Sequence, residues 1–428
     1  MSEVSLLILI LIVLALLLQL DFVFYIVYVI GAIFLFSRWF APRVFRQLKL
    51  ERMFTDHAFL GERIRVTLRL HNRGRLPLPW LQLSESVAPE LAGGSGHAFA
   101  LSLAGRESRD IHYDVQATRR GYYQLGPLHI RSGDLFGWSE ERAESDPSYL
   151  TIYPRIIPLT QLGLPSRLPF GTIASRQRLF EDPARPAGVR DYHSGDSLRL
   201  INWKVSAHHN NLVVKTLQPA ISLETFILLN LNADEYSAQT RYSAPEWAIE
   251  IAASVAAHLV ERKQAVGLAS NGLDPLRQLA GRSAAGLPFD EVTGRLLLAK
   301  DSDAASSMLP PPILPRAGRA HLMNILELLA RVEARRTVPF AVWASRATLH
   351  LGWGVTIPVI TPHAGDQTFQ ALHRLVRSGY NPVLIVTTPV LHFGQIRERA
   401  RQLGFTAFEI AGRADLAAWR RPHFAGLP

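Results

Sequence analysis

The chain has 428 residues, of which 48% are hydrophobic and 19% are charged, so it is not a wholly disordered protein. Its length predicts two or three domains, and the absence of cysteine excludes disulfides, thiolate metal centres and a cysteine nucleophile. The formal net charge of +10 suits nucleic acid, an anionic membrane surface or an acidic partner, and does not choose among them.

An apolar segment, residues 4–36, opens the chain and is interrupted only by Ser5, Gln19 and Asp21. As one helix it would be about 50 Å long, against a hydrocarbon core of about 30 Å, and Asp21 would lie near the bilayer centre. We therefore expect residues 1–40 to form a transmembrane hairpin of two short helices, Val4–Leu20 and Phe22–Phe36, in preference to a single crossing. A signal peptide is disfavoured because no Lys or Arg precedes the apolar run.

Basic residues follow the apolar segment directly. By the positive-inside rule they place this flank, and everything after it, in the cytoplasm. The expected location is therefore the inner or plasma membrane, with the soluble domains in the cytoplasm. The residues concerned are Arg38, Arg43, Arg46, Lys49 and Arg52.

Residues 41–157 have the period-two pattern of half-buried strands. Ile64, Val66, Leu68 and Leu70 alternate with polar residues, and similar segments lie at 81–83, 111–115, 122–130 and 149–153. Short strands separated by Gly and Pro predict an antiparallel sandwich of the immunoglobulin or fibronectin kind. Asp134, in the segment 132–138, is expected to cap a turn between two of these strands.

Residues 158–218 are expected to form a linker, extended and without periodicity as far as residue 190. A dense polar cluster follows at 190–209. In one interpretation Asp196, Arg199, Trp203 and Lys204 form a recognition surface. In the other, Asp196 and Arg199 make a local ion pair while Trp203 fills a domain junction. A metal site at His193, His208 and His209 is disfavoured, because side chains of adjacent residues point in different directions.

Residues 219–428 alternate strands and helices. The strands are expected at 226–231, 265–269, 355–360 and 382–387, and the helices at 245–263, 289–299, 321–333, 367–378 and 393–403, with a surface insertion at 301–315. This order predicts a doubly wound, mostly parallel α/β sheet, whose ligands lie beyond the carboxyl ends of the strands. The residues that follow strands there are Asn230, Asn232, Asp234, Thr361 and His363.

Several segments closely resemble the bacterial family called domain of unknown function 58: Arg119–Pro127, Asp134–Gly137, Ile152–Arg155, and Gly188–Ala207 around Tyr192, Gly195, Asp196, Arg199 and Trp203. The resemblance implies that the last domain is similar to a von Willebrand factor type A domain. It also implies that the protein acts with a MoxR-type AAA ATPase in assembling or activating other proteins. No enzymatic activity is implied.

One departure from the type A domain concerns its metal site, which begins Asp-x-Ser-x-Ser. The matching residues here are Asn230, Asn232 and Asp234. All offer oxygen atoms, but a neutral amide replaces the leading carboxylate that Mg²⁺ favours. We therefore expect no cofactor, with weak or absent Mg²⁺ binding at a degenerate site.

The expected function is a membrane-anchored, non-enzymatic scaffold or adaptor that binds proteins. The alternative is a hydrolase with a site around Asp196 and a nearby His, but the chain has no nucleophile elbow, zinc-protease motif or phosphate-binding loop. Nucleic acid is not an expected partner, because the Arg residues are dispersed over all domains and mixed with acids.

Overall fold

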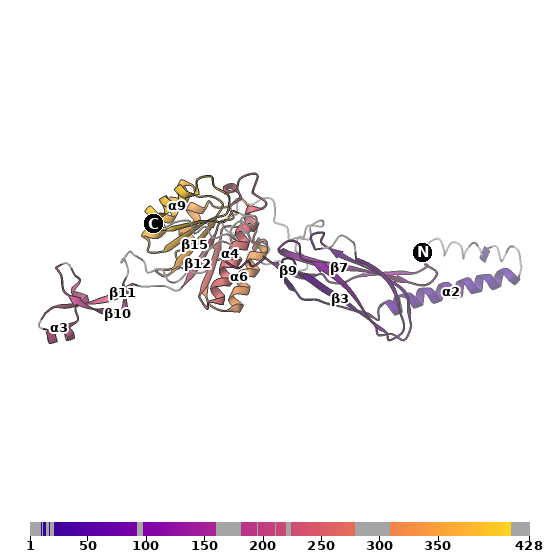
Figure 1. The fold of residues 1–428 in the computed structure, drawn as a ribbon. Helices are drawn as coiled ribbons and strands as arrows, with labels where there is room; N and C mark the ends of the chain where they lie inside the picture. The colour runs from indigo at the N-terminus through magenta and orange to yellow at the C-terminus, as the bar shows by residue number, and fades with distance from the viewer. Residues whose placement is uncertain are drawn as a thin grey trace. The chain divides into compact units, whose positions relative to one another are not determined.

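The computed structural model describes residues 21–91, 97–159, 181–194, 196–209, 211–219, 224–278 and 309–411, together with residues 10, 12, 13 and 17. These described residues divide into two compact units, one up to Tyr153 and one from Pro154 onward (Figure 1). Each is described by itself below.

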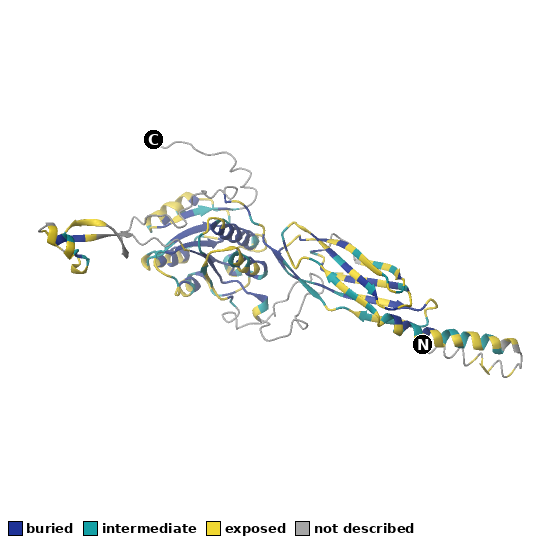
Figure 2. Ribbon diagram, turned by 90° about the horizontal axis from the view of Figure 1, so that it is seen from below, coloured by how far each residue is buried: buried dark blue, intermediate teal, exposed yellow. Residues whose placement is uncertain are grey.

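A long apolar helix, α2 (Asp21–Phe45), begins the first unit, and its last 22 residues are apolar enough to cross a membrane. Figure 2 shows many residues of this helix as exposed. The expected first arm, Val4–Leu20, and the turn after it lie mostly outside the described residues. The expected end at Phe36 is wrong: the helix continues to Phe45, because Ser37, Ala41 and Val44 are buried against the β-strands that follow.

Two sheets make up the rest of the first unit. One has the order β1 (Leu48–Met53), β3 (Arg63–Asn72), β6 (Ser108–Gln116). The other has the order β2 (His57–Phe59), β9 (Ser148–Tyr153), β7 (Gly121–Gly133), β4 (Leu78–Val87), β5 (His97–Leu103), with β8 (Glu140–Glu144) also paired to β7. All pairs are antiparallel except β2 with β9.

The alternation predicted for β3 is confirmed, since Ile64, Val66, Leu68 and Leu70 are all buried. They share one hydrophobic core with Leu81 and Leu83 of β4 and with Leu128 of β7, so the two sheets enclose a common interior. The interruption expected at Gly126-Pro127 is a register shift in the pairing with β4, between Glu85↔Leu128 and Val87↔Leu125. It does not end the strand, which continues on both sides and pairs with β9 over its first half.

The second unit contains a two-stranded antiparallel ribbon, β10 (Glu181–Asp191) and β11 (Val213–Pro219). Between its strands lie η1 (Leu198–Leu200) and α3 (Trp203–His209). We call residues 181–219 the ribbon module. The expected extended connector up to residue 190 is therefore partly wrong, since its end is a strand paired to residues that follow the polar cluster.

The second unit also contains a six-stranded sheet, in the order β14 (Ile313–Arg316), β13 (Val266–Ser270), β12 (Thr225–Leu229), β15 (Thr356–Thr361), β16 (Asn381–Val386), β17 (Thr406–Glu409). The mostly parallel arrangement is confirmed; only β14 runs antiparallel, within the expected surface insertion. β17 was not predicted from the sequence.

Helices cover both faces of this sheet (Figure 1). Phe226 and Leu228 of β12 share a core with Phe340 of α7 and Phe369 of α8, and α4 packs on β12, β13 and β15. The expected helix at 289–299 lies outside the described residues. The helices are α4 (Ala244–Glu261), α5 (Pro275–Gln278), α6 (Arg319–Arg331), α7 (Phe340–Ala347), α8 (Asp366–Arg377) and α9 (Phe393–Gln402), with the short η2 (Ala233–Glu235).

The chain leaves β12 toward β13 on one side and later returns to β15 on the other. The strand order therefore reverses between β12 and β15, and such a switch point is where open α/β sheets bind ligands. Asn230 follows β12 and Thr361 ends β15, so the sequence-predicted residues lie at this point.

Candidate functional site

Asn230 is fully buried at the switch point. Its Nδ2 donates to Glu235 Oε2 at 2.7 Å and to Thr361 Oγ1 at 3.0 Å. Its Oδ1 accepts from the backbone N of Asn232 at 3.2 Å and from Asn271 Nδ2 at 3.0 Å. Both donor hydrogens and both acceptor positions of the amide are therefore used within the protein.

Asn232 is engaged in the same network. Its Oδ1 accepts from the backbone N of Thr337 at 3.1 Å and of Asp234 at 3.4 Å, while its Nδ2 donates to Glu235 Oε1 at 3.4 Å. Glu235 Oε1 also accepts from the backbone N of Phe340 at 2.7 Å, where α7 begins. A carboxylate there is favoured by the partial positive charge of the helix start.

Asp234 turns away from this network. Its carboxylate pairs with Arg336 at 2.9 Å, with half of the Asp234 side chain exposed. Within the described ranges no group of three His, Asp or Glu side chains is placed to hold a metal. The Oδ1 atoms of Asn230 and Asn232 already accept hydrogen bonds from N–H groups, so these side chains hold the loop after β12 in place.

Sequence reasoning placed Asn230, Asn232, Asp234 and Thr361 at the correct strand ends but missed Glu235 and Asn271. Asn271 follows β13 closely, as Asn230 follows β12, so the same strand-end rule could have found it. Glu235 lies in η2 and gives no such signal. The loop is ordered around it, because the buried Tyr236 hydroxyl donates to the Asn230 carbonyl at 2.7 Å.

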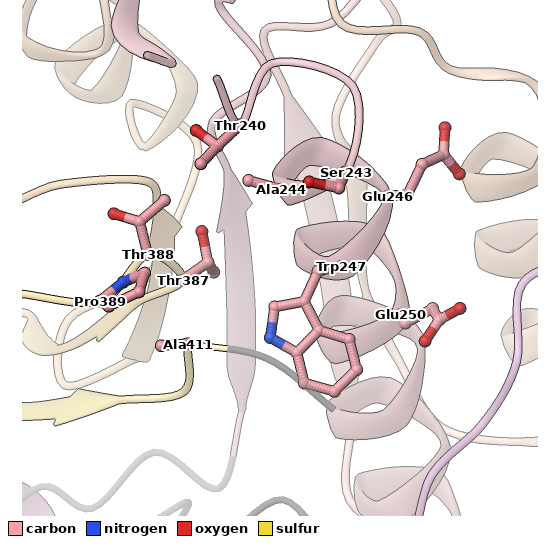
Figure 3. Close-up of a pocket in the computed structure, with 10 residues that line it drawn as sticks. All are labelled: Thr240, Ser243, Ala244, Glu246, Trp247, Glu250, Thr387, Thr388, Pro389 and Ala411. Atoms are coloured by element: carbon pink, nitrogen blue, oxygen red, sulfur yellow. The ribbon is translucent and has the colours of Figure 1, made fainter. Parts of the chain in front are cut away.

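A pocket of about 390 Å³ lies between the start of α4 and the loop after β16. Figure 3 labels its lining residues, which include Glu246 and Glu250 of α4 and Thr387 and Thr388 after β16. The Trp247 indole donates to the Ile410 carbonyl at 2.7 Å, so its N–H is engaged within the wall. The pocket lining thus combines hydroxyl groups of Thr387 and Thr388 with the two glutamates of α4.

In the ribbon module, Asp196 makes a bidentate ion pair with Arg190, at 2.6 and 2.7 Å. Its Oδ2 also accepts from the backbone N of His193 at 2.9 Å. The Arg190 hydrogen bonds, followed by that of His193, lower the pKa of Asp196 to about 2. The expected local ion pair therefore exists, but the partner is Arg190 and not Arg199.

Several other residues of the polar cluster are exposed. Trp203 is 67% exposed and Leu198 66% exposed, while Arg199 and Lys204 are also exposed. Trp203 is thus at the surface of the ribbon module, and its expected role at a domain junction stays a prediction. Tyr192 is half-buried and its backbone N donates to the Leu212 carbonyl at 2.8 Å; Gly195 lies outside the described residues.

Of the three histidines considered for a metal site, only His193 and His208 have described side chains. His193 Nδ1 lies 3.2 Å from the cationic Nη1 of Arg190, a neighbour that disfavours a metal ion at that nitrogen. His208 is exposed, and the side chain of His209 is outside the described part of the chain.

Residues 188–342 match the model of the family described as "Protein of unknown function DUF58". The matched segment contains most of the ribbon module and the switch-point residues of β12. It confirms the family resemblance for this part of the chain. The family resemblance of the segments before residue 188 stays a prediction.

The chain is also similar to the Bacillus subtilis "Uncharacterized protein YeaD", with 24% identity over 218 residues. The match covers 50% of this chain and 52% of the relative, so it spans about half the length of each.

Among solved structures, one similar chain is Escherichia coli alpha-2-macroglobulin from domain MG7 to the C-terminus (18% identity, 26% of this chain and 17% of the other, TM-score 0.23). Another is a CARDB domain from Pyrococcus furiosus in complex with di-metal ions (14% identity, 24% and 91%, TM-score 0.19). At such scores neither likeness informs the fold or the function.

Proposed function

We propose that this chain is a membrane-anchored, non-enzymatic scaffold that binds other proteins and acts with a MoxR-type AAA ATPase in assembling or activating them. The observation that carries the proposal is the exposure of Trp203 and Leu198 in the ribbon module. Large apolar side chains held at a surface are typical of protein-binding sites, and Trp is over-represented among the residues that dominate binding energy.

Charge around these side chains favours an acidic partner surface. The Arg190 guanidinium is paired with Asp196, whereas Arg199 and Lys204 are exposed near Trp203 in the sequence. Opposite charges at the rim of an interface raise the association rate and select the partner. An acidic face of an ATPase or client would suit this surface.

The hydrolase alternative receives little support from Asp196. A general acid or base works best with a pKa near the working pH, whereas Arg190 keeps this carboxylate ionised well below neutrality. At the switch point, the amides of Asn230 and Asn232 are hydrogen-bonded within the protein, which likewise supports a protein that works without a metal or other cofactor.

Nucleic acid is not a proposed partner, because many described Arg residues are paired with acids. Arg69 pairs with Asp110 at 2.9 Å and Arg401 with Glu398 at 3.0 Å.

We also propose two finer fold assignments, an immunoglobulin- or fibronectin-like first unit and a von Willebrand factor A-like last domain. The soluble domains are proposed to lie on the cytoplasmic side of the inner or plasma membrane.

The proposal is tested by recovering partners on the tagged, detergent-extracted full-length protein from its own cells. Trp203→Ala should reduce recovery of an AAA ATPase about tenfold or more, as loss of an interface hot spot does. Trp353→Ala is the matched control, because Trp353 has the same 67% exposure but lies in the α/β sheet region. Equal recovery on both variants, or no ATPase on the wild-type protein, contradicts the proposal.

A further inference from the structure

The turn between β7 and β8, residues 134–139, carries exposed apolar side chains. Leu135 is 78% exposed and Phe136 is 58% exposed. The Phe136 ring stacks on Trp138, with centroids 5.2 Å apart. Gly137 between them has a φ of +72°, which lets the turn bend so that the two rings meet.

The turn is fastened to helix α2. The Trp138 ring lies 6.3 Å from the ring of Phe34, and the Ser37 hydroxyl donates to the buried carboxylate of Asp134. Asp134 also accepts from the backbone N of Ser139 at 3.2 Å, which confirms it as the cap of this turn. Its carbonyl accepts from the Trp80 indole at 2.9 Å, so the turn is held from both the helix and the sheet.

The contact with Phe34 sets the depth of the turn. Phe34 precedes Arg38, the first basic residue after the apolar segment, by four residues. Those four residues span about 6 Å along a helix. With Arg38 at the headgroups, Phe34 lies at the boundary between headgroups and acyl chains, where aromatic residues are enriched in membrane proteins. Trp138 touches Phe34 and therefore lies near that boundary.

Charge does not oppose contact with lipid at the tip. Residues 135–138 carry no ionisable side chain, and Asp134 is buried. Where β8 begins, Glu140 pairs with Arg131 at 2.6 Å and with Arg142 at 3.2 Å, so its charge is balanced. An apolar tip bordered by paired charges suits the membrane interface.

We propose that the turn 134–139 inserts Leu135 and Phe136 into the interface of the same bilayer that α2 crosses, as a second membrane contact. Continuity with the apolar helix argues for lipid over a protein partner, because a partner would have to compete with the bilayer for this position. The proposal rests on the membrane anchor of the proposed function.

The chain has no cysteine, so single cysteines can carry a fluorophore without background labelling. We would place one at Leu35 of α2, Leu135, Phe136 or Met53. Met53 is exposed and is the last residue of β1, at the strand end farther from α2 along the chain. Each full-length variant is reconstituted in phosphatidylcholine–phosphatidylglycerol vesicles, with or without acyl-chain-brominated lipid.

Bromine quenches a fluorophore that contacts acyl chains. Quenching at positions 135 and 136 comparable to that at 35, and its absence at 53, is the expected result. Quenching at 35, with positions 135 and 136 behaving like 53, overturns the inserted turn and leaves the anchor standing. No quenching at 35 overturns the anchor itself and the inference with it.

Discussion

The hydrogen bonds of Asn230 show why the first residue after β12 is an amide and not a carboxylate. An aspartate could not donate to Glu235, and its carboxylate would lie about where the amide nitrogen now stands, 2.7 Å from Glu235 Oε2. Two carboxylates that close, in a buried place, repel strongly. The neutral side chain is therefore required by the glutamate, which the strand-end rule could not reveal from the sequence.

Asn230→Asp should destabilise the protein by about 3 kcal/mol or more, since it buries an uncompensated charge. Asn324→Asp, the same change at an exposed position of α6, should have little effect. Thermal unfolding of the detergent-extracted protein measures both. Millimolar Mg²⁺ should leave the unfolding temperature of the wild-type protein unchanged; a saturable rise would show that a metal binds after all.

At the scale of elements, the turn of the ribbon module depends on a pairing that spans it. Arg190, at the end of β10, reaches forward to Asp196, and His193 between them donates its backbone N–H to the same carboxylate. Sequence proximity favoured Arg199, only three residues from Asp196. The end of β10 instead places Arg190 beside Asp196. This position of β10 depends on its pairing with β11, which the local sequence does not show.

The Asp196 carboxyl should titrate near pH 2, since its pKa is lowered from 3.8 to about 2. Its stabilising effect is thus full above the unfolded pKa and is lost as the pH falls through about 2. NMR chemical shifts of the aspartate ¹³Cγ atoms, with the Asp196 signal assigned by its loss in Asp196→Asn, would follow this titration. Arg190→Ala should raise the pKa toward its ordinary value, and Arg199→Ala should not; the opposite order would refute the observed pairing.

Elements with strong periodicity were predictable and weaker ones were not. β3 and α4 have clear apolar alternation or an apolar stripe, and both appear where expected. β8 consists almost entirely of charged residues and exists because it pairs with β7. β14 is short and only half-buried, and it joins the sheet as an antiparallel edge. Such strands are determined by their partners, which a local pattern does not contain.

For the whole molecule, the positive flank after α2 predicts which side of the membrane the soluble units occupy. Leu391 is 98% exposed, so Leu391→Cys offers a labelling site in the second unit. We expect a membrane-impermeant maleimide to label it only after the inner membrane is permeabilised. Ser2→Cys should behave identically if the apolar segment is a hairpin; labelling of position 2 alone in intact cells would indicate a single crossing.

The burial of Ser37, Ala41 and Val44 has a mechanical consequence. No flexible linker separates α2 from the sheets of the first unit, because the helix ends at Phe45 and β1 begins at Leu48. A force or torque applied to the first unit by a protein partner would therefore tilt or rotate α2 within the lipid. A flexible linker between α2 and the sheet would instead absorb it.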